Sequence, residues 1–279
     1  MDNYYLMGRT YKGKLRDMTS GIGPLLLLMG LFLLAAALSS VPWLAPDWEN
    51  FYRPGALSAR PNDVFGNYAP PWTYPVLWPI AVLGDGLSKG VLTLATVFVC
   101  WRFMGSWRRF ALLCLTMPFV ATVAFGQIDT LSLVGLMAPA DLSLLFLTMK
   151  PQGAILAALK ERLTVRSVCI LLILVAVSLL LWGWWPASLL ARTDWSTDCS
   201  PWPYGIPFGL GLLYWQWKRG FDSDSALCVA TLLLVPYFFY TSMLPAVAAT
   251  IKEMDDDWPM MLLVVGVTWL MVIFAGVGL

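Results

Sequence analysis

Histidine is missing from this 279-residue chain, and charged residues are few. Without histidine no imidazole can act as a general base, and the commonest ligand of catalytic zinc is lacking as well. The five cysteines are scattered and form no Cys-x-x-Cys pair, so the sequence shows no cysteine metal-binding motif. Lysine and arginine number 18 against 17 aspartates and glutamates, so the net charge gives no indication of a nucleic-acid partner.

Hydrophobic residues make up 59% of the chain and charged residues 13%. Soluble domains carry about 25% charged and about 45–50% apolar residues. Three stretches, 24–44, 167–190 and 258–279, contain no charge at all. Each is long enough to cross a bilayer core of about 30 Å, which takes roughly 20 apolar residues, and lipid admits only helices or closed barrels. Strict alternation is absent, so the sequence predicts an all-α, polytopic transmembrane bundle that forms a single membrane domain over 1–279.

Eight apolar segments are predicted to span the membrane. They are 22–44, 88–104, 110–126, 130–149, 167–190, 203–217, 226–250 and 258–278. A ninth segment, 72–84, is shorter, and Pro75 and Pro79 interrupt it. Because proline breaks the helical hydrogen-bond ladder, we expect a partial or interfacial helix there.

The distribution of lysine and arginine predicts the orientation of the chain, since short cytoplasmic loops are enriched in both. Basic clusters precede the first segment and recur near Arg108, Lys160 and Lys218, with acidic or mixed loops between them. This alternation is consistent if eight segments span and the ninth does not. It places 1–21 in the cytoplasm and 45–71 outside the cell (plasma) membrane, as the first outer loop. If the ninth segment does span, the middle of the topology inverts.

The first outer loop combines acids, arginines and aromatic residues, and we expect it to be ordered and to lie back on the membrane. A carboxylate that is partly desolvated there becomes a stronger base, and guanidinium groups bind phosphate through paired hydrogen bonds. The candidate residues in this loop are Asp47, Glu49, Arg53, Arg60 and Asp63. The alternative for each acid is an ordinary solvated loop residue.

Two further places outside this loop hold candidate residues, and a third polar residue, Lys150, is interpreted as structural. The turn 126–129 separates two apolar segments, and its Gln127 and Asp129 either line the same cavity as the first loop or form an ordinary polar turn. Lys150 is interpreted as the end of a span on the basic side, where its ammonium extends toward the interface. Tyr240 lies in a late apolar segment, where its hydroxyl either lines a cavity or bonds a neighbouring helix.

Several short motifs occur in an order that resembles a known family. They are Asp47-Trp48 with Phe51-Tyr52, Pro70-Pro71-Trp72 with Tyr74-Pro75, Trp78-Pro79, Gly126-Gln127-Ile128-Asp129, Lys150-Pro151-Gln152, Trp202-Pro203, Pro236-Tyr237 and Leu244-Pro245-Ala246. In order and spacing they resemble the integral membrane glycosyltransferases of the GT-C fold, nearest to glycosyltransferase family eighty-seven, the polyprenol-phosphate-mannose-dependent mannosyltransferases. The similarity spans most of the chain, and the shared order of the motifs carries it.

The resemblance implies transfer of a sugar, a hexose such as mannose, from a polyprenyl-phosphate donor to an acceptor at the outer membrane face. It also implies no cofactor, since the donor is a lipid-linked sugar phosphate and no nucleotide or metal would be bound in the core mechanism. In that family an acidic residue of the first outer loop is the catalytic base, and Asp47 matches its position. From the chemistry we expect Arg53 or Arg60 to neutralise the leaving phosphate, and Gln127 and Asp129 to position the sugar or the acceptor. The remaining substrate-binding candidates are Glu49, Asp63 and Tyr240.

Two other classes of function compete with the transferase. A non-catalytic GT-C-like subunit of a larger complex would contact partner membrane subunits and membrane lipid through its apolar, tryptophan-rich faces. A transporter typically shows repeated halves with paired broken helices. The sequence shows no such internal symmetry, so the transporter ranks last.

Overall fold

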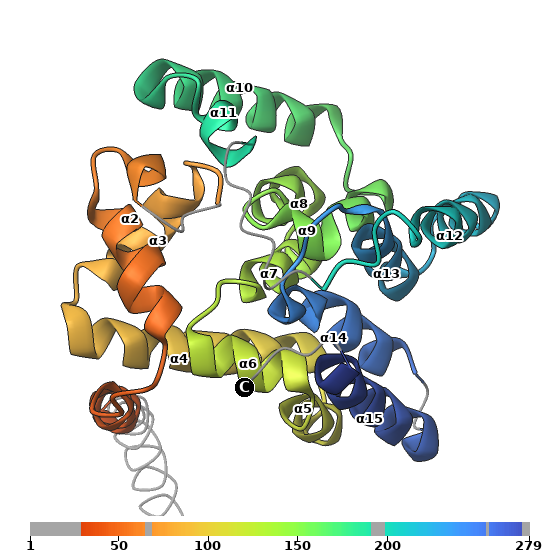
Figure 1. Ribbon diagram of the computed structural model, residues 1–279, viewed down its shortest axis with the longest axis horizontal. Helices are drawn as coiled ribbons and strands as arrows, with labels where there is room; N and C mark the ends of the chain where they lie inside the picture. The colour runs from red at the N-terminus through yellow and green to blue at the C-terminus, as the bar shows by residue number, and fades with distance from the viewer. Residues whose placement is uncertain (1–28, 65–68, 191–198, 255–256, 275–279) are drawn as a thin grey trace, which may run out of the picture.

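The computed structural model describes residues 29–64, 69–190, 199–254 and 257–274, and Figure 1 shows their arrangement. Within these ranges the chain is helical and contains no strand, which confirms the all-α prediction. The predicted cytoplasmic segment 1–21 lies outside the described residues. After a first helix described over Met29–Ser39, the elements are η1 Trp48–Tyr52, α2 Arg53–Leu57, η2 Pro61–Asp63, α3 Thr73–Ala81, α4 Asp85–Met104, α5 Trp107–Cys114, α6 Met117–Phe125, α7 Thr130–Met137, α8 Ala140–Leu147, α9 Pro151–Ala154, η3 Ile155–Leu159, α10 Val165–Trp182, α11 Trp185–Leu190, α12 Ile206–Lys218, α13 Asp224–Leu234, η4 Tyr240–Met243, α14 Leu244–Glu253 and α15 Trp258–Phe274.

Two of the described helices, α4 and α10, are long and apolar enough to cross a membrane. The pair α5 and α6 would count as a third span, although the chain bends by 73° between them. These helices fit an integral membrane protein, whereas about eight spans are not confirmed. In the other apolar segments the described helices are shorter, and some segments, such as 130–149 and 226–250, are divided where prolines interrupt them. The segment 72–84 forms α3, whose nine residues extend about 14 Å and are too short to cross, as predicted.

The segment 130–149 is a helical hairpin and not a straight span. Helices α7 and α8 have eight residues each, about 12 Å, and they fold against each other across Pro139. The Ser143 hydroxyl donates to the Gly135 carbonyl at 2.6 Å, and a Cβ on Gly135 would lie only 2.9 Å from the Leu147 side chain. The chain therefore enters and returns, and the hairpin starts and ends at the same end of the bundle.

The return of this hairpin corrects the predicted place of Lys150. Its ammonium lies 2.7 Å from the Asp129 carboxylate, at the start of α7. Lys150 was predicted on the basic side and Asp129 on the outer side, and two groups in contact cannot lie on opposite faces. Helix α9 and η3 then lead to Arg162, which donates to the Leu136 carbonyl at 3.2 Å and so lies at the far tip of the hairpin. Where one span was predicted over 130–149, the chain therefore makes three short passes, formed by α7, by α8 and by α9 with η3.

The described part of the first outer loop is ordered, as predicted. Helix η1 is a π-helical turn, a form found often at functional sites. Trp48 and Tyr52 of this turn are buried in a cluster with Tyr74 and Leu77 of α3 and with Ile128. The apolar side chains of the loop thus anchor it to α3 and to the turn that precedes α7.

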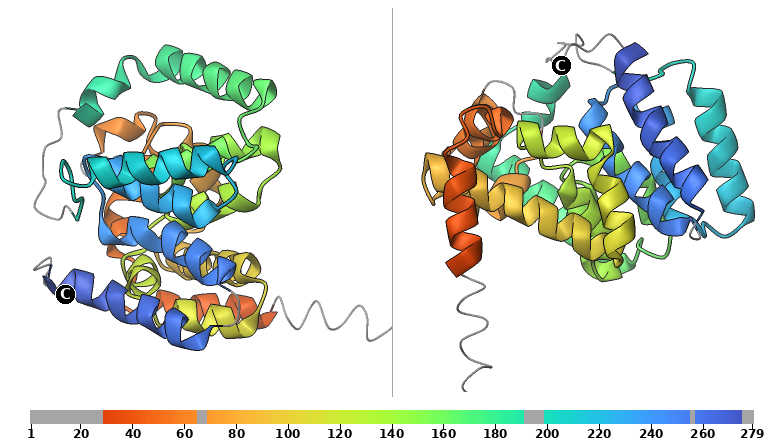
Figure 2. Two further views of the ribbon diagram at one scale, coloured as in Figure 1. Left: turned by 90° about the vertical axis from the view of Figure 1, so that its right-hand side faces the viewer. Right: turned by 90° about the horizontal axis from the view of Figure 1, so that it is seen from below.

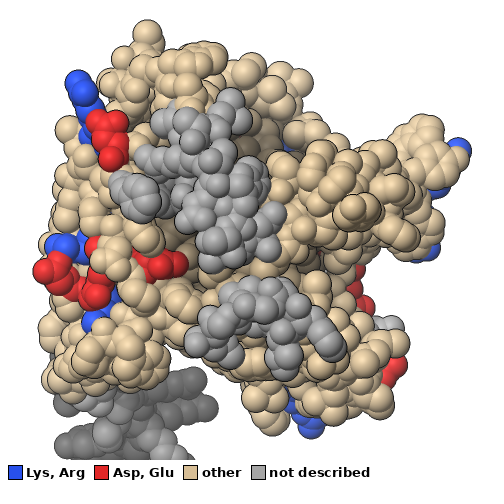
Figure 3. All heavy atoms as spheres, viewed as in Figure 1, with Lys and Arg blue, Asp and Glu red and all other residues tan. Residues whose placement is uncertain are grey.

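Two ion pairs tie the same loop to the start of α4. Glu49 lies 3.1 Å from Lys89, whose ammonium also donates to the Val41 carbonyl at 3.0 Å. Arg53 pairs with Asp85 and donates from Nε to the Ala81 carbonyl at 3.0 Å. Figure 3 shows charged side chains on the left edge of the visible face and a few more at its right and lower edges, while most of the atoms that are not grey are uncharged.

Gly126 lets the first loop cross the end of α6 in close contact. Its φ of +69° caps α6 in the left-handed region, and a Cβ there would lie 2.6 Å from the Ala45 Cβ and 2.9 Å from the Trp48 Cβ. The Ala45 amide donates to the Ala124 carbonyl at 2.7 Å, which fixes the crossing. Glycine is required here for both conformation and space, and the crossing brings Asp47 next to Gln127.

We expect Gly126→Ala to lower the apparent melting temperature in detergent by several degrees more than Gly105→Ala. Both positions have positive φ, so both alanines incur a left-handed penalty of about 1–2 kcal/mol. Only position 126 adds a steric clash, since nothing lies within 4 Å of a Cβ on Gly105. Thermal denaturation followed by size-exclusion fluorescence measures the difference. Equal losses would show that the crossing has room for a methyl group.

Candidate functional site

Asp47 follows the first helix and stands at the N-cap of η1, where its side chain is half-buried. The chain reaches this position through Ala45, whose φ of +60° turns it over Gly126. Gln127 donates a hydrogen bond from Nε2 to the Asp47 carboxylate. The predicted neighbourhood of the first loop and the 126–129 turn is therefore present.

Gln127 joins four polar residues into one buried network. Its Oε1 accepts a hydrogen bond from the Tyr52 hydroxyl at 2.9 Å and one from the Lys150 ammonium at 2.6 Å. Lys150 also donates to Asp129 Oδ2 at 2.7 Å. The side chains of Lys150 and Asp129 are 8% and 1% exposed, so this ion pair is shielded from solvent. The network unites η1, the turn before α7 and the end of the hairpin.

Asp129 keeps one carboxylate oxygen without a partner. Its Oδ1 is buried and accepts no hydrogen bond from any group in the described residues. A buried acceptor without a donor costs about 1–3 kcal/mol or more when it is charged, so such an atom indicates a place for a water or a ligand hydroxyl. Asp47, whose side chain is half-buried, offers a second carboxylate beside Gln127.

Burial raises the pKa of Asp47 above its ordinary value, and this is the largest effect on the group. The hydrogen bond from Gln127 and the charge of Lys150 act in the opposite direction, while the charge of Asp129 raises the pKa further. Burial also raises the pKa of Tyr52 well above its ordinary value, with Asp129 and Asp47 adding to the effect. Tyr52 therefore stays protonated and remains a hydrogen-bond donor to Gln127.

The other predicted residues of the first loop lie outside this network. Glu49 and Arg53 are engaged in the ion pairs to α4. Arg60 and Asp63 are exposed, and neither side chain forms an ion pair with a described residue. Of the two arginines predicted to bind phosphate, Arg60 still has a guanidinium group available for it. The guanidinium of Arg53 already binds the Asp85 carboxylate and the Ala81 carbonyl.

Tyr240 approaches the site from the late part of the chain. It is 3% exposed and lies in η4, between α13 and α14. Its ring contacts Phe125 with the ring centres 6.2 Å apart, and Phe125 stands two residues before Gln127. Phe239 packs on both rings, so an aromatic cluster borders the polar network.

Two members of the network were not among the predicted site residues. Tyr52 was noted only as part of a motif, and Lys150 was interpreted as an interfacial lysine. A signal for Lys150 does exist in the sequence. Asp129 and Lys150 flank an apolar segment that Pro139 interrupts near its middle, and such an interruption suits a hairpin whose charged ends meet.

No group of three or more acidic or cysteine side chains that could hold a metal ion occurs in the part of the chain that the structure describes. The cysteines described there are free, and Cys100 and Cys228 are buried.

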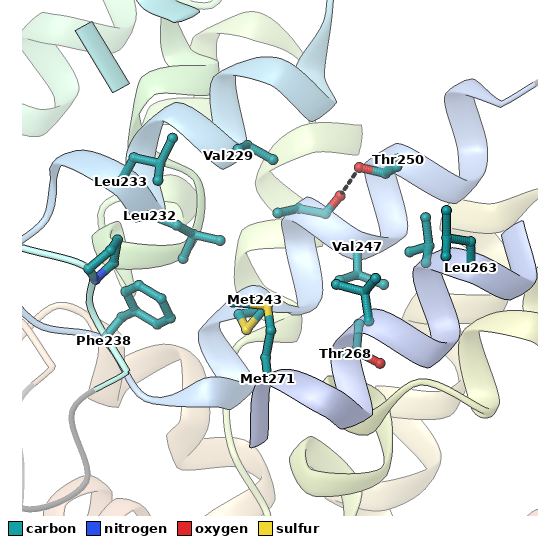
Figure 4. A pocket seen from close by; sticks show the side chains of 14 residues that line it. Val229, Leu232, Leu233, Phe238, Met243, Val247, Thr250, Leu263, Thr268 and Met271 are labelled. Carbon is teal, nitrogen blue, oxygen red and sulfur yellow. Dashed lines mark hydrogen bonds between the residues drawn. The ribbon is translucent and has the colours of Figure 1, made fainter. Parts of the chain in front are cut away.

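An apolar groove lies between α13, α14 and α15 (Figure 4) and has a volume of about 340 Å³. Its lining is almost entirely aliphatic, aromatic and methionine side chains. The two threonines that border it satisfy their own hydroxyls, since Thr250 donates to Ala246 and Thr268 donates to Val265. Phe238 lines one end, directly before the aromatic pair that borders the polar network.

Comparisons with known proteins yield no matching family model, no matching curated protein and no matching solved structure. The functional argument therefore rests on the residues and their geometry.

We expect the Asp129 and Lys150 pair to show strong thermodynamic coupling. Removing one member of a buried pair leaves the other charge uncompensated and costs about 3–5 kcal/mol. Asp129→Asn and Lys150→Met should each lower the melting temperature, and the double variant should recover most of the loss. Thermal denaturation of all three variants measures the coupling.

The exposed pair Arg219 and Asp222 provides the control for this cycle. Exposed ion pairs contribute about 0–1 kcal/mol, so Arg219→Met and Asp222→Asn should each change the melting temperature little. Additive losses at Asp129 and Lys150 would contradict a buried ion pair.

Proposed function

We propose that this protein is a membrane glycosyltransferase that moves a hexose, such as mannose, from a polyprenyl-phosphate donor to an acceptor hydroxyl. The observation that carries the proposal is Asp47. It is a half-buried carboxylate of raised pKa, set beside a buried network at the end of the first apolar helix. The order of motifs that resembles the mannosyltransferase family supports the same reaction.

In the proposed reaction Asp47 accepts the proton of the acceptor hydroxyl. The acceptor oxygen forms a bond to the anomeric carbon, the bond from that carbon to the phosphate oxygen breaks, and polyprenyl phosphate leaves with the electron pair. General-base assistance of this kind contributes about 10²–10⁴-fold to the rate. A raised pKa makes Asp47 a stronger base than a solvated aspartate.

Substrate contacts follow from the groups that have bonding capacity left. The free Oδ1 of Asp129 suits a sugar hydroxyl, which would donate to it. The exposed guanidinium of Arg60 suits the donor phosphate. Glu49 and Arg53 would act by holding the loop in place. Asp63 would contact the substrate from the exposed side, and Tyr240 from the aromatic cluster beside the network.

The apolar groove supports a substrate with a hydrocarbon chain. Burial of each CH₂ contributes about 0.8 kcal/mol, and the groove offers no unsatisfied polar group that such a chain would have to cover. Because Phe238 borders both the groove and the aromatic cluster near Gln127, a chain in the groove could extend toward the network.

Asp47→Asn should reduce transfer by at least about 10²-fold and leave the protein folded. The amide cannot accept the proton, yet its oxygen still accepts the hydrogen bond from Gln127. Burial raises the pKa of Asp47 in the folded chain, so its ionisation opposes folding and the neutral amide should cost no stability. The assay follows radiolabelled hexose from a short-chain polyprenyl phosphate into acceptor in detergent, with melting temperature measured in parallel.

Asp222→Asn is the matched control, since it removes an exposed acid that forms an ion pair with Arg219. It should transfer like the wild type. Unchanged transfer by Asp47→Asn would remove Asp47 as the base and with it the proposed mechanism.

Transfer should also fall at acid pH with a midpoint above the ordinary aspartate range near about 4. The active form of a base is deprotonated, and a raised pKa shifts its loss to higher pH. The profile of kcat/KM against pH measures this limb. A limb at the ordinary aspartate value would indicate a solvated base and contradict the assignment.

A non-catalytic membrane subunit is the second candidate, and α10 favours it. This helix is the most apolar of the described long helices, yet only 11% of its apolar window is buried. Figure 1 and Figure 2 show it along the edge of the molecule, beside α8 and the loop near α2. Purification in mild detergent distinguishes the candidates: a subunit co-purifies in fixed stoichiometry with other chains and shows no transfer.

A further inference from the structure

The orientation of the Gln127 amide is determined by its neighbours. A lysine ammonium has three donors and no acceptor, so only the amide oxygen of Gln127 can face Lys150 at 2.6 Å. The Tyr52 hydroxyl donates to the same oxygen at 2.9 Å. With the oxygen held by two donors, the amide nitrogen is left to point at Asp47, to which it donates.

Lys150 is itself fixed in place by the hairpin. Its ammonium contacts Asp129 Oδ2 at 2.7 Å, and its backbone carbonyl accepts a hydrogen bond from Ser132 at 3.3 Å. The adjacent Met149 carbonyl accepts one from Thr73, at the start of α3. These contacts involve both arms of the hairpin and a neighbouring helix, so the charge cannot move without disturbing the packing.

The groups that face Asp47 are few. Gln127 and Asp129 approach from the turn before α7, Lys150 from the end of α8, Tyr52 from η1 and Tyr240 from η4. Among these described groups Lys150 supplies the positive charge and Asp129 the second negative charge. The two phenols are neutral when protonated. The hydrogen bond from Gln127 and the Lys150 ammonium therefore oppose the burial of the Asp47 carboxylate and the repulsion from Asp129.

We propose that Lys150 is a positioning residue that orients Gln127 and holds Asp47 as an ionised, aimed carboxylate, with Asp129 acting against it. In this role the buried ion pair is a structural contact and also controls the proton affinity and the orientation of the neighbouring Asp47. The importance of this control for catalysis rests on the proposed function. The state of Asp47 can be measured without any transfer reaction.

The experiment is a pH titration of Asp47 by infrared difference spectroscopy on the purified full chain in detergent. Each protein is measured with and without the additional substitution Asp47→Asn. The carbonyl stretching band of a protonated carboxyl group that disappears with this substitution is assigned to Asp47. Lys150→Met should weaken the ionised form and raise the proton affinity of Asp47 by at least about threefold. Asp129→Asn should lower it, because the opposing charge is gone while Lys150 remains. Lys150→Arg should stay near the wild type.

Opposite shifts from the two members of one ion pair are the distinguishing result. A purely structural pair would lower stability in both variants and move Asp47 in the same direction or not at all. Arg166→Met is the charge control, since Arg166 pairs with Asp141 near the far end of the hairpin and should leave Asp47 unchanged. If Lys150→Met fails to fold, the downward shift in Asp129→Asn supports the proposal, and an unchanged midpoint overturns it.

Transfer assays then separate this inference from the proposed function. The acid limb of kcat/KM should move to higher pH in Lys150→Met and to lower pH in Asp129→Asn. Opposite spectroscopic shifts without any detectable transfer would keep the positioning role and dismiss the transferase. Identical Asp47 titrations in all variants would dismiss the positioning role, whatever the transfer activity.

Discussion

The buried ion pair between Lys150 and Asp129 is the constraint on which the centre of this structure depends. Two opposite charges with almost no solvent contact must stay together, since separation would leave each uncompensated in an apolar surrounding. Their contact closes the base of the α7–α8 hairpin. It also decides that residues 130–149 turn back instead of crossing, and it supplies the donor that orients Gln127.

Around this pair, different contacts hold the first loop in place. The glycine at position 126 permits the first loop to approach, π-helical η1 buries Trp48 and Tyr52, and the ion pairs of Glu49 and Arg53 hold the loop to the start of α4. The charged residues of the loop, which the sequence does not distinguish, therefore have two different roles in the structure. Asp47 belongs to the polar network, whereas Glu49 and Arg53 fasten the segment that carries it.

Much of this arrangement could be predicted from the sequence, and the reason is the strength of the apolar signal. Composition alone indicated membrane helices, and the clustering of acids and aromatics located the ordered loop and its neighbour at 126–129. The path of the chain could not be predicted, because hydropathy measures apolarity and not direction. A hairpin buried in protein and a span buried in lipid have the same composition. The sequence likewise did not indicate the ion-pair partner of Arg53, which is Asp85, 32 positions further along the chain.

The three short passes between Asp129 and Arg162 have a consequence for how the chain is built into a bilayer. Helices of eight residues or fewer leave their backbone ends at depths where lipid offers no hydrogen bonds, so they are tolerable only when other protein surrounds them. The insertion machinery can release α4 and α10 sideways into lipid as independent units. Residues 130–162 need their neighbours first, and this part of the polypeptide should be the last to mature after synthesis.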